Sequence, residues 1–148
     1  MITLRPVRPD DVNWLVDLRI ATMGGYLRAS GETLTREDQA ARVAYAFDDI
    51  RVVEDEAEPI GMIKVTRAPD VWKLVQIQML PDYQGRGIGT RLIGALQEEA
   101  HALGQAIELS VLNVNPALRL YERLGFAVVE RKQRSTTMRW SPSGRLDQ

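Results

Sequence analysis

The sequence predicts a mixed α/β (α+β) fold, with elements in the order β-α-α-β-β-β-α-β-α-β-β and helices on both faces of a mixed sheet. Three observations predict this fold. Short β-branched or alternating apolar runs are separated by segments in which apolar residues recur every three or four positions. Runs joined by turns predict antiparallel hairpins, and two strand–helix–strand units predict parallel pairs.

The first helical pattern has recognisable ends. Asp10 or Asp11 caps it, and a pair of glycines, Gly24-Gly25, is expected to end it. Residues 26–33 then show no helical or strand pattern, so we expect an irregular segment there.

Three further helical patterns follow. Thr35 begins a sequence that resembles a capping box, and the apolar pattern behind it runs to Phe47. The third helix is expected from Ile88 to Gly104 and the fourth ends at Gly125. The strands are expected at residues 2–5, 50–54, 60–67, 71–80, 107–111, 126–131 and 136–140.

Composition narrows the class of protein. The 148 residues are enough for one domain, expected over residues 1–140 with a polar tail at 141–148. The net charge of −1 gives no global field for nucleic acid or a membrane surface, and there is no membrane-spanning run or signal peptide, so a cytoplasmic protein is expected. With no cysteine and one histidine, thiol chemistry is excluded and a metal site is not expected.

A glycine-rich segment joins the strand at 71–80 to the third helix. Residues 76–90 read Q-I-Q-M-L-P-D-Y-Q-G-R-G-I-G-T, with Gly85, Gly87 and Gly89 at alternate positions. Glycines let the backbone approach a large group without a Cβ in the way, and the N-terminus of a helix offers unpaired N–H groups to an anion. The segment predicts a pyrophosphate cradle, although a tight turn without a ligand would carry the same glycines.

The spacing distinguishes this loop from two other phosphate-binding loops. A Walker A loop needs a lysine, but Gly89 is followed by Thr90, and a G-x-G-x-x-G pattern begun at Gly85 also meets Thr90 at its sixth position. The pattern Gln84-x-x-Gly87-x-Gly89 instead resembles the acyl-CoA-binding loop of the GCN5-related N-acetyltransferase (GNAT) family, Gln/Arg-x-x-Gly-x-Gly/Ala.

A second segment resembles the same family. Residues 115–126 read N-P-A-L-R-L-Y-E-R-L-G-F, similar to its Asn-x-x-x-x-x-Tyr-x-x-x-Gly-Phe helix and turn. The resemblance implies a largely antiparallel sheet with a splayed central strand pair. It also implies an N-acetyltransferase that moves an acetyl group from its co-substrate acetyl-CoA to a primary amine of a small molecule or peptide by direct attack, without a metal.

The resemblance further assigns roles to single residues. Ile77 and Met79 would offer backbone groups to the pantetheine arm, and Asn115 would hydrogen-bond that arm or cap its own helix. The residues implied in cofactor binding are Ile77, Met79, Leu80, Gln84, Gly85, Arg86, Gly87, Ile88, Gly89, Thr90, Asn115 and Tyr121.

Tyr121 is the residue to which the resemblance gives a catalytic role. Acyl transfer from a thioester needs a neutral amine, an oxyanion donor and help for the leaving thiolate. A phenol with a pKa of about 10 is too weak an acid to protonate a thiolate of pKa about 8.5 outright, so we expect it to hydrogen-bond the sulfur and pass its proton as the bond breaks. Tyr121 also shares an apolar stripe with Leu118 and Leu124, a position that fits a core tyrosine.

The general base and the acceptor are less defined. The strand before the loop carries Gln76 and Gln78 where the family often has an acidic residue, and Glu108 on the neighbouring strand fits a solvent-facing glutamate better than a base. The resemblance places an acceptor wall at residues 19–36. The residues expected to contact the acceptor are Tyr26, Trp72, Gln76 and Gln78.

Two other functions stay open at this stage. A non-catalytic acyl-CoA-binding sensor or regulatory module fits the missing strand carboxylate, and the glycine loop also fits a module that binds ATP or NAD. The sequence identifies neither the acceptor amine nor the range of acyl groups. It leaves the oligomeric state open, with a homodimer among the options.

Overall fold

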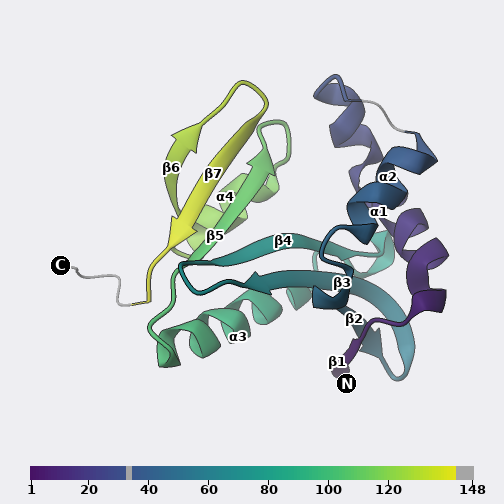
Figure 1. Ribbon diagram of the computed structural model, residues 1–148, viewed down its shortest axis with the longest axis horizontal. Helices are drawn as coiled ribbons and strands as arrows, with labels where there is room; N and C mark the ends of the chain where they lie inside the picture. The colour runs from purple at the N-terminus through teal and green to yellow at the C-terminus, as the bar shows by residue number, and fades with distance from the viewer. Residues whose placement is uncertain (33–34, 143–148) are drawn as a thin grey trace. The chain divides into compact units, whose positions relative to one another are not determined.

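The computed structural model describes residues 1–32 and 35–142. The strands are β1 (Ile2–Pro6), β2 (Ile50–Asp55), β3 (Glu58–Arg67), β4 (Trp72–Met79), β5 (Ile107–Leu112), β6 (Ala127–Arg131) and β7 (Ser135–Trp140). The helices are α1 (Val12–Ala29), α2 (Arg36–Ala44), α3 (Ile88–Ala102) and α4 (Ala117–Arg123), with 3-10 turns η1 (Pro9–Asp11), η2 (Phe47–Asp49) and η3 (Pro81–Tyr83). Figure 1 follows these elements along the chain.

The described strands form a seven-stranded, mostly antiparallel sheet in the order β1-β2-β3-β4-β5-β7-β6. The element order is the one that the sequence predicts, and the mixed α+β fold class is confirmed. The chain divides into two compact units, the first made of Met1–Val65 and Gln76–Ile88, the second of Thr66–Val75 and the described residues from Gly89 onward.

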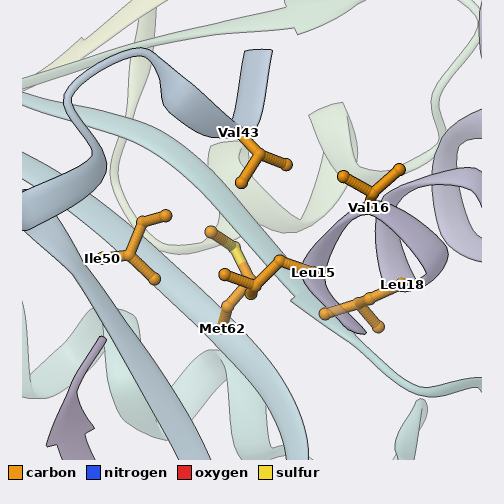
Figure 2. Packing of buried hydrophobic residues seen from close by; sticks show 6 residues of the cluster. All are labelled: Leu15, Val16, Leu18, Val43, Ile50 and Met62. Atoms are coloured by element: carbon orange, nitrogen blue, oxygen red, sulfur yellow. The ribbon is translucent and has the colours of Figure 1, made fainter. Parts of the chain in front are cut away.

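In the first unit, helices α1 and α2 bury their apolar faces against strands β2 and β3. The strands β1, β2 and β3 pair antiparallel in succession. Figure 2 shows the side chains that converge on this core, each at most 2% exposed: Leu15, Val16, Leu18, Val43, Ile50 and Met62. Burying a side chain of this size stabilises the fold by about 1.5–3 kcal/mol, so this cluster is the main reason why the two helices stay on the sheet.

The second unit contains the parallel pair, β4 with β5, and the antiparallel pairs β5 with β7 and β6 with β7. The first strand–helix–strand unit therefore gives a parallel pair, as predicted. The second strand–helix–strand segment, β5–α4–β6, is also predicted to give a parallel pair. This prediction is wrong, because β7 lies between β5 and β6 in the sheet. Burial gives the physical reason: β7 buries Thr136 and Met138 completely, whereas β6 is exposed along most of its length and suits the sheet edge.

Helix α1 is longer than the sequence predicts. It continues through Gly24 and Gly25 to Ala29, so the helix end expected at these glycines is wrong, as is the irregular conformation expected for residues 26–29. A glycine costs a helix about 1 kcal/mol relative to alanine. Leu27, at 2% exposed, offsets this cost through its burial.

Helix α2 is shorter than predicted and ends at Ala44. Thr35 caps its first turn as expected, because its Oγ1 accepts from the N–H of Asp38 at 3.1 Å. Ala46 adopts a left-handed φ of 51° and turns the chain into η2, which contains Phe47. A helix prediction that reaches Phe47 is therefore wrong.

The C-terminal end of α2 is held by Lys64 of β3, which is fully buried. Its Nζ donates hydrogen bonds to the main-chain oxygens of Arg42, Val43 and Tyr45 at 3.0, 3.3 and 2.5 Å. A cation at this end of a helix satisfies carbonyls that have no partner within the helix and interacts favourably with the helix dipole.

No helix in the described part of the chain is long and apolar enough to span a membrane. A polar tail is predicted at residues 141–148. Residues 143–148 of this tail lie outside the described residues.

Candidate functional site

The glycine loop follows η3 and leads into α3. Gly85 and Gly87 have φ values of 75° and 79°, a left-handed backbone that glycine adopts without strain. Both residues are exposed, and a Cβ built on either one would have no atom within 4 Å. The loop thus leaves open space beside its main chain at two alternate residues, which fits the close approach of a bulky anion such as a pyrophosphate.

Two side chains hold the loop in place within the first unit. The Nε2 of Gln84 donates to the main-chain oxygen of Met79 at 3.1 Å, which ties the loop to the end of β4. The guanidinium of Arg86 lies 4.8 Å from the centre of the Tyr83 ring, a cation–π contact that keeps a positive charge on the loop. The expectation of a local anion site rests on this charge and on the loop amides.

The end of β4 is packed closely against β3. The N–H of Leu80 donates to the main-chain oxygen of Ile60 at 2.7 Å, so this donor is already used by the protein. A Cβ at Gly61 would overlap the main-chain oxygen of Gln78 and the sulfur of Met79. Gly61 is therefore a glycine because β4 passes so close to it.

In the second unit, Asn115 lies directly before α4, whose N-cap residue is Pro116. Its Oδ1 accepts from the N–H of Ala117 at 2.9 Å, while its own N–H donates to the main-chain oxygen of Leu112. The helix therefore starts one residue later than a cap at Asn115 requires, although the Asn115 side chain still satisfies the N–H of the first helical residue.

Tyr121 is half-buried on α4, and its ring meets that of Phe126 edge to face with centroids 5.9 Å apart. Its hydroxyl makes no hydrogen bond to any residue in the ranges 1–32 and 35–142, and burial raises the pKa of Tyr121 above its ordinary value. Every fully buried side-chain nitrogen or oxygen of these residues has a partner. The unpartnered hydroxyl oxygen is therefore not fully buried, unlike that of a core tyrosine with a satisfied hydroxyl.

The residues expected to contact the acceptor differ in burial. Trp72 is 4% exposed, with the guanidinium of Arg67 4.9 Å from its ring centre, and Gln78 is 8% exposed. Gln76 on β4 and Tyr26 on α1 are half-buried.

Glu108, considered above as a base, is engaged in an ion pair. Its Oε2 accepts from Nη2 of Arg139 at 2.8 Å, across the paired strands β5 and β7. This pairing fits the solvent-facing role that the sequence favours. Among the described residues, no three histidine, aspartate or glutamate side chains are close enough to hold a metal ion.

Sequence reasoning missed a set of buried polar residues, namely Arg19, Gln39 and Lys64. Arg19 occupies a core position in the apolar stripe of α1, and Lys64 interrupts an apolar strand. A charged residue at a position that the pattern assigns to the core was the available signal.

Comparison with known proteins adds to this geometry. The sequence profile described as "Acetyltransferase (GNAT) domain" matches residues 46–128. The chain belongs to the GNAT acetyltransferase family. Acetyltransferase Pat of Mycolicibacterium smegmatis is 33% identical over 140 residues, which cover 82% of this GNAT chain and 40% of that protein. The chain therefore spans well under two thirds of this curated relative.

Two solved structures illustrate the shared fold. The PaiA N-acetyltransferase of Thermoplasma acidophilum, in complex with coenzyme A, has a TM-score of 0.71 at 18% identity, with 95% of this chain and 99% of that chain covered. The ribosomal-protein-S18-alanine N-acetyltransferase of Escherichia coli has a TM-score of 0.72 at 18% identity, with 99% and 97% covered. The GNAT fold expected from the two motifs is thus confirmed.

Proposed function

We propose that this GNAT chain is an N-acetyltransferase that moves an acetyl group from acetyl-CoA to a primary amine of a small molecule or peptide by direct attack. The observation that carries the proposal is the hydroxyl of Tyr121, which is not fully buried and makes no hydrogen bond to any described residue. A half-buried hydroxyl that the protein leaves unpaired is available to a reacting group.

The co-substrate would be held by the glycine loop. The main-chain N–H groups between Gln84 and Thr90, with the guanidinium of Arg86, would bind the pyrophosphate. The left-handed glycines and the open space beside them support this role. Acetyl-CoA supplies the acetyl thioester, and the coenzyme A in the Thermoplasma protein is consistent with this choice. Ile77 and Met79 of β4 would pair with the amides of the pantetheine arm.

Tyr121 would act on the sulfur of the leaving thiolate. Because burial raises its pKa, the phenol stays protonated at neutral pH and remains a hydrogen-bond donor. The same shift makes it a weaker acid than an exposed tyrosine, so its main contribution is a hydrogen bond to the developing negative charge. Its proton is transferred to the sulfur as the carbon–sulfur bond breaks, the amine nitrogen loses its own proton to solvent, and the phenolate of Tyr121 regains a proton from solvent before the next turnover.

The acceptor of this chain would be an amine of a small molecule or a peptide. The name of the Escherichia coli protein specifies an alanine of ribosomal protein S18, whereas the name of the Mycolicibacterium smegmatis protein specifies no acceptor, so the proposal stays at the level of the amine class. The two glutamines of β4 would position the amine, since a carboxamide hydrogen-bonds without taking a proton.

One experiment tests the proposal as a whole. Free thiol release is followed with acetyl-CoA and a panel of amines and peptides, alongside thermal shifts with coenzyme A, ATP and NAD. We expect thiol release that depends on one of the amines and a raised midpoint with coenzyme A. Coenzyme A binding without release for any amine would favour the sensor function, and a shift with ATP or NAD alone would contradict acyl transfer.

A further inference from the structure

A side-chain hydrogen bond joins helix α3 to the end of helix α4 in the second unit. Gln97, on α3, donates from its Nε2 to the main-chain oxygen of Leu124 at 2.8 Å. Leu124 directly follows α4, the helix that carries Tyr121. The hydrogen bond therefore crosses between two helices and links residues that are 27 positions apart in the sequence.

The accepting oxygen belongs to the turn that ends α4. Within this turn, the N–H of Leu124 donates to the main-chain oxygen of Tyr121 at 3.1 Å. The N–H of Phe126 donates to the same oxygen at 3.0 Å. Leu124 thus accepts from Gln97 and donates to Tyr121. Two successive hydrogen bonds connect the carboxamide on α3 with the main chain of the tyrosine.

The position of Gln97 on α3 suits an apolar residue. Ile93, Leu96 and Ala100 form the buried face of this helix, each at most 5% exposed. Gln97 follows Ile93 by four residues, which places it beside this face, and it is half-buried. An apolar side chain here would extend the buried face. The glutamine instead donates to a carbonyl at the end of α4, where carbonyls lack partners within the helix, so this position serves the contact with α4.

The two helices carry different parts of the proposed reaction. Gly89 and Thr90, at the start of α3, are among the residues proposed to bind the pyrophosphate, and Gln97 lies roughly 12 Å further along this helix. Tyr121, on α4, is proposed to act on the sulfur. The pyrophosphate and the sulfur belong to one molecule, so the helix that holds the first needs a fixed position relative to the helix that acts on the second. A displacement of about 1 Å in such an arrangement can cost about 10²-fold in rate.

We propose that Gln97 is a positioning residue, which holds the end of α4 so that the hydroxyl of Tyr121 meets the sulfur of bound acetyl-CoA. It acts through the main chain of Leu124. Without the donor, the turn after α4 loosens and the ring of Tyr121 loses its fixed orientation. The effect on rate rests on the function proposed above for Tyr121, whereas the contact itself is tested without acetyl-CoA.

The first test follows the turn in the full chain without any ligand. Gln97→Met keeps an unbranched, helix-forming side chain but removes the donor. The ring signals of Tyr121 are recorded by NMR with isotope-labelled tyrosine and are assigned by their loss in Tyr121→Phe. We expect these signals to shift in Gln97→Met. The N–H of Phe126 should exchange with solvent about five- to tenfold faster, because the turn has lost one hydrogen bond.

The second test measures kcat and the Kd for acetyl-CoA, with the amine that gives the fastest thiol release in the panel above. We expect Gln97→Met to lower kcat by about tenfold while the Kd stays within about twofold of the wild-type value. Gln97→Lys again places a donor at the end of α4, where a cation is favourable, and should keep kcat within about threefold of the wild type. In the Tyr121→Phe background, Gln97→Met should lower kcat by no more than about twofold, because the hydroxyl that Gln97 positions is already absent.

Gln105→Met is the matched control. Gln105 is also a half-buried glutamine, three residues after the end of α3, and its side chain makes no hydrogen bond within the described part of the chain.

Three results would overturn the proposal. They are unchanged Tyr121 signals and Phe126 exchange in Gln97→Met, an equal change in Gln105→Met, and the same fold loss of kcat with and without the Tyr121 hydroxyl. The absence of thiol release with every amine would contradict the proposed function, whereas the ligand-free signals would still decide on the contact of Gln97, so the two proposals fail separately.

Discussion

The main-chain N–H of Phe126 donates to the main-chain oxygen of Tyr121 at 3.0 Å, and the two rings meet edge to face at an interplanar angle of 63°. Gly125, between them in the chain, has a φ of 97° and lets the backbone reverse directly after α4. Phe126 is 3% exposed and anchors the turn in the core. The orientation of the Tyr121 ring is therefore fixed by a local helix end.

Gly125→Ala tests this turn. The left-handed backbone strains any side chain, and the new Cβ would lie 3.3 Å from Cδ1 of Trp140. We expect a loss of about 1–2 kcal/mol in the free energy of unfolding, measured by urea denaturation, together with a lower kcat. Gly94→Ala is the control, because Gly94 lies in α3 with no atom within 4 Å of a Cβ, and alanine should stabilise that helix by up to about 1 kcal/mol. Equal stability of Gly125→Ala and the wild type would contradict the account.

Gly87→Ala tests the glycine loop as the pyrophosphate site. A Cβ there would occupy the open space beside the loop and strain a backbone at φ 79°. We expect the KM for acetyl-CoA to rise by about tenfold or more, since the anion loses close contact with the loop amides. The comparison variant is Gly25→Ala, at an exposed helical glycine with equal space around it. An unchanged KM in Gly87→Ala would exclude the loop from cofactor binding.

Lys64→Met tests the contact between β3 and the end of α2. Methionine fills the volume but leaves three main-chain oxygens without their donor, so we expect a loss of about 1–3 kcal/mol in the free energy of unfolding. Lys73→Met, at an exposed lysine of β4, should change stability by no more than about 0.5 kcal/mol. A neutral effect of Lys64→Met would show that the carbonyls find other partners.

The pH dependence of stability gives a second test of Lys64. Burial lowers its pKa to about 8, whereas an unfolded lysine titrates at about 10.4. Between these values the unfolded chain binds more protons than the folded one, so this lysine makes stability rise with pH. The stability difference between the wild type and Lys64→Met should therefore grow from pH 8 to pH 10. A difference that stays constant over this range would contradict the lowered pKa.

Local signals in the sequence predict much of this fold correctly. Thr35 caps α2 where expected, and Asn115 accepts from the first N–H of α4 from one residue before its N-cap, because both contacts join residues two or three apart. Gly85 and Gly87 have the left-handed backbone that a tight cradle needs.

Tertiary contacts account for what the sequence could not predict. The length of α1 depends on the burial of Leu27, and the place of β7 between β5 and β6 depends on the burial of Met138, which no local pattern reveals. The bond between Arg19 and Gln39 joins residues twenty positions apart. Sequence spacing alone could not anticipate a buried guanidinium with a neutral partner.

The most direct test of the central claim compares kcat and the Kd for acetyl-CoA of Tyr121→Phe with those of the wild type. Phenylalanine keeps the ring contact with Phe126 and removes the unpaired hydroxyl. We predict that kcat falls by about 10²–10⁴-fold while the Kd for acetyl-CoA and the free energy of unfolding stay close to the wild-type values. A Tyr121→Phe variant that turns over acetyl-CoA at nearly the wild-type rate would contradict the proposed role of this hydroxyl.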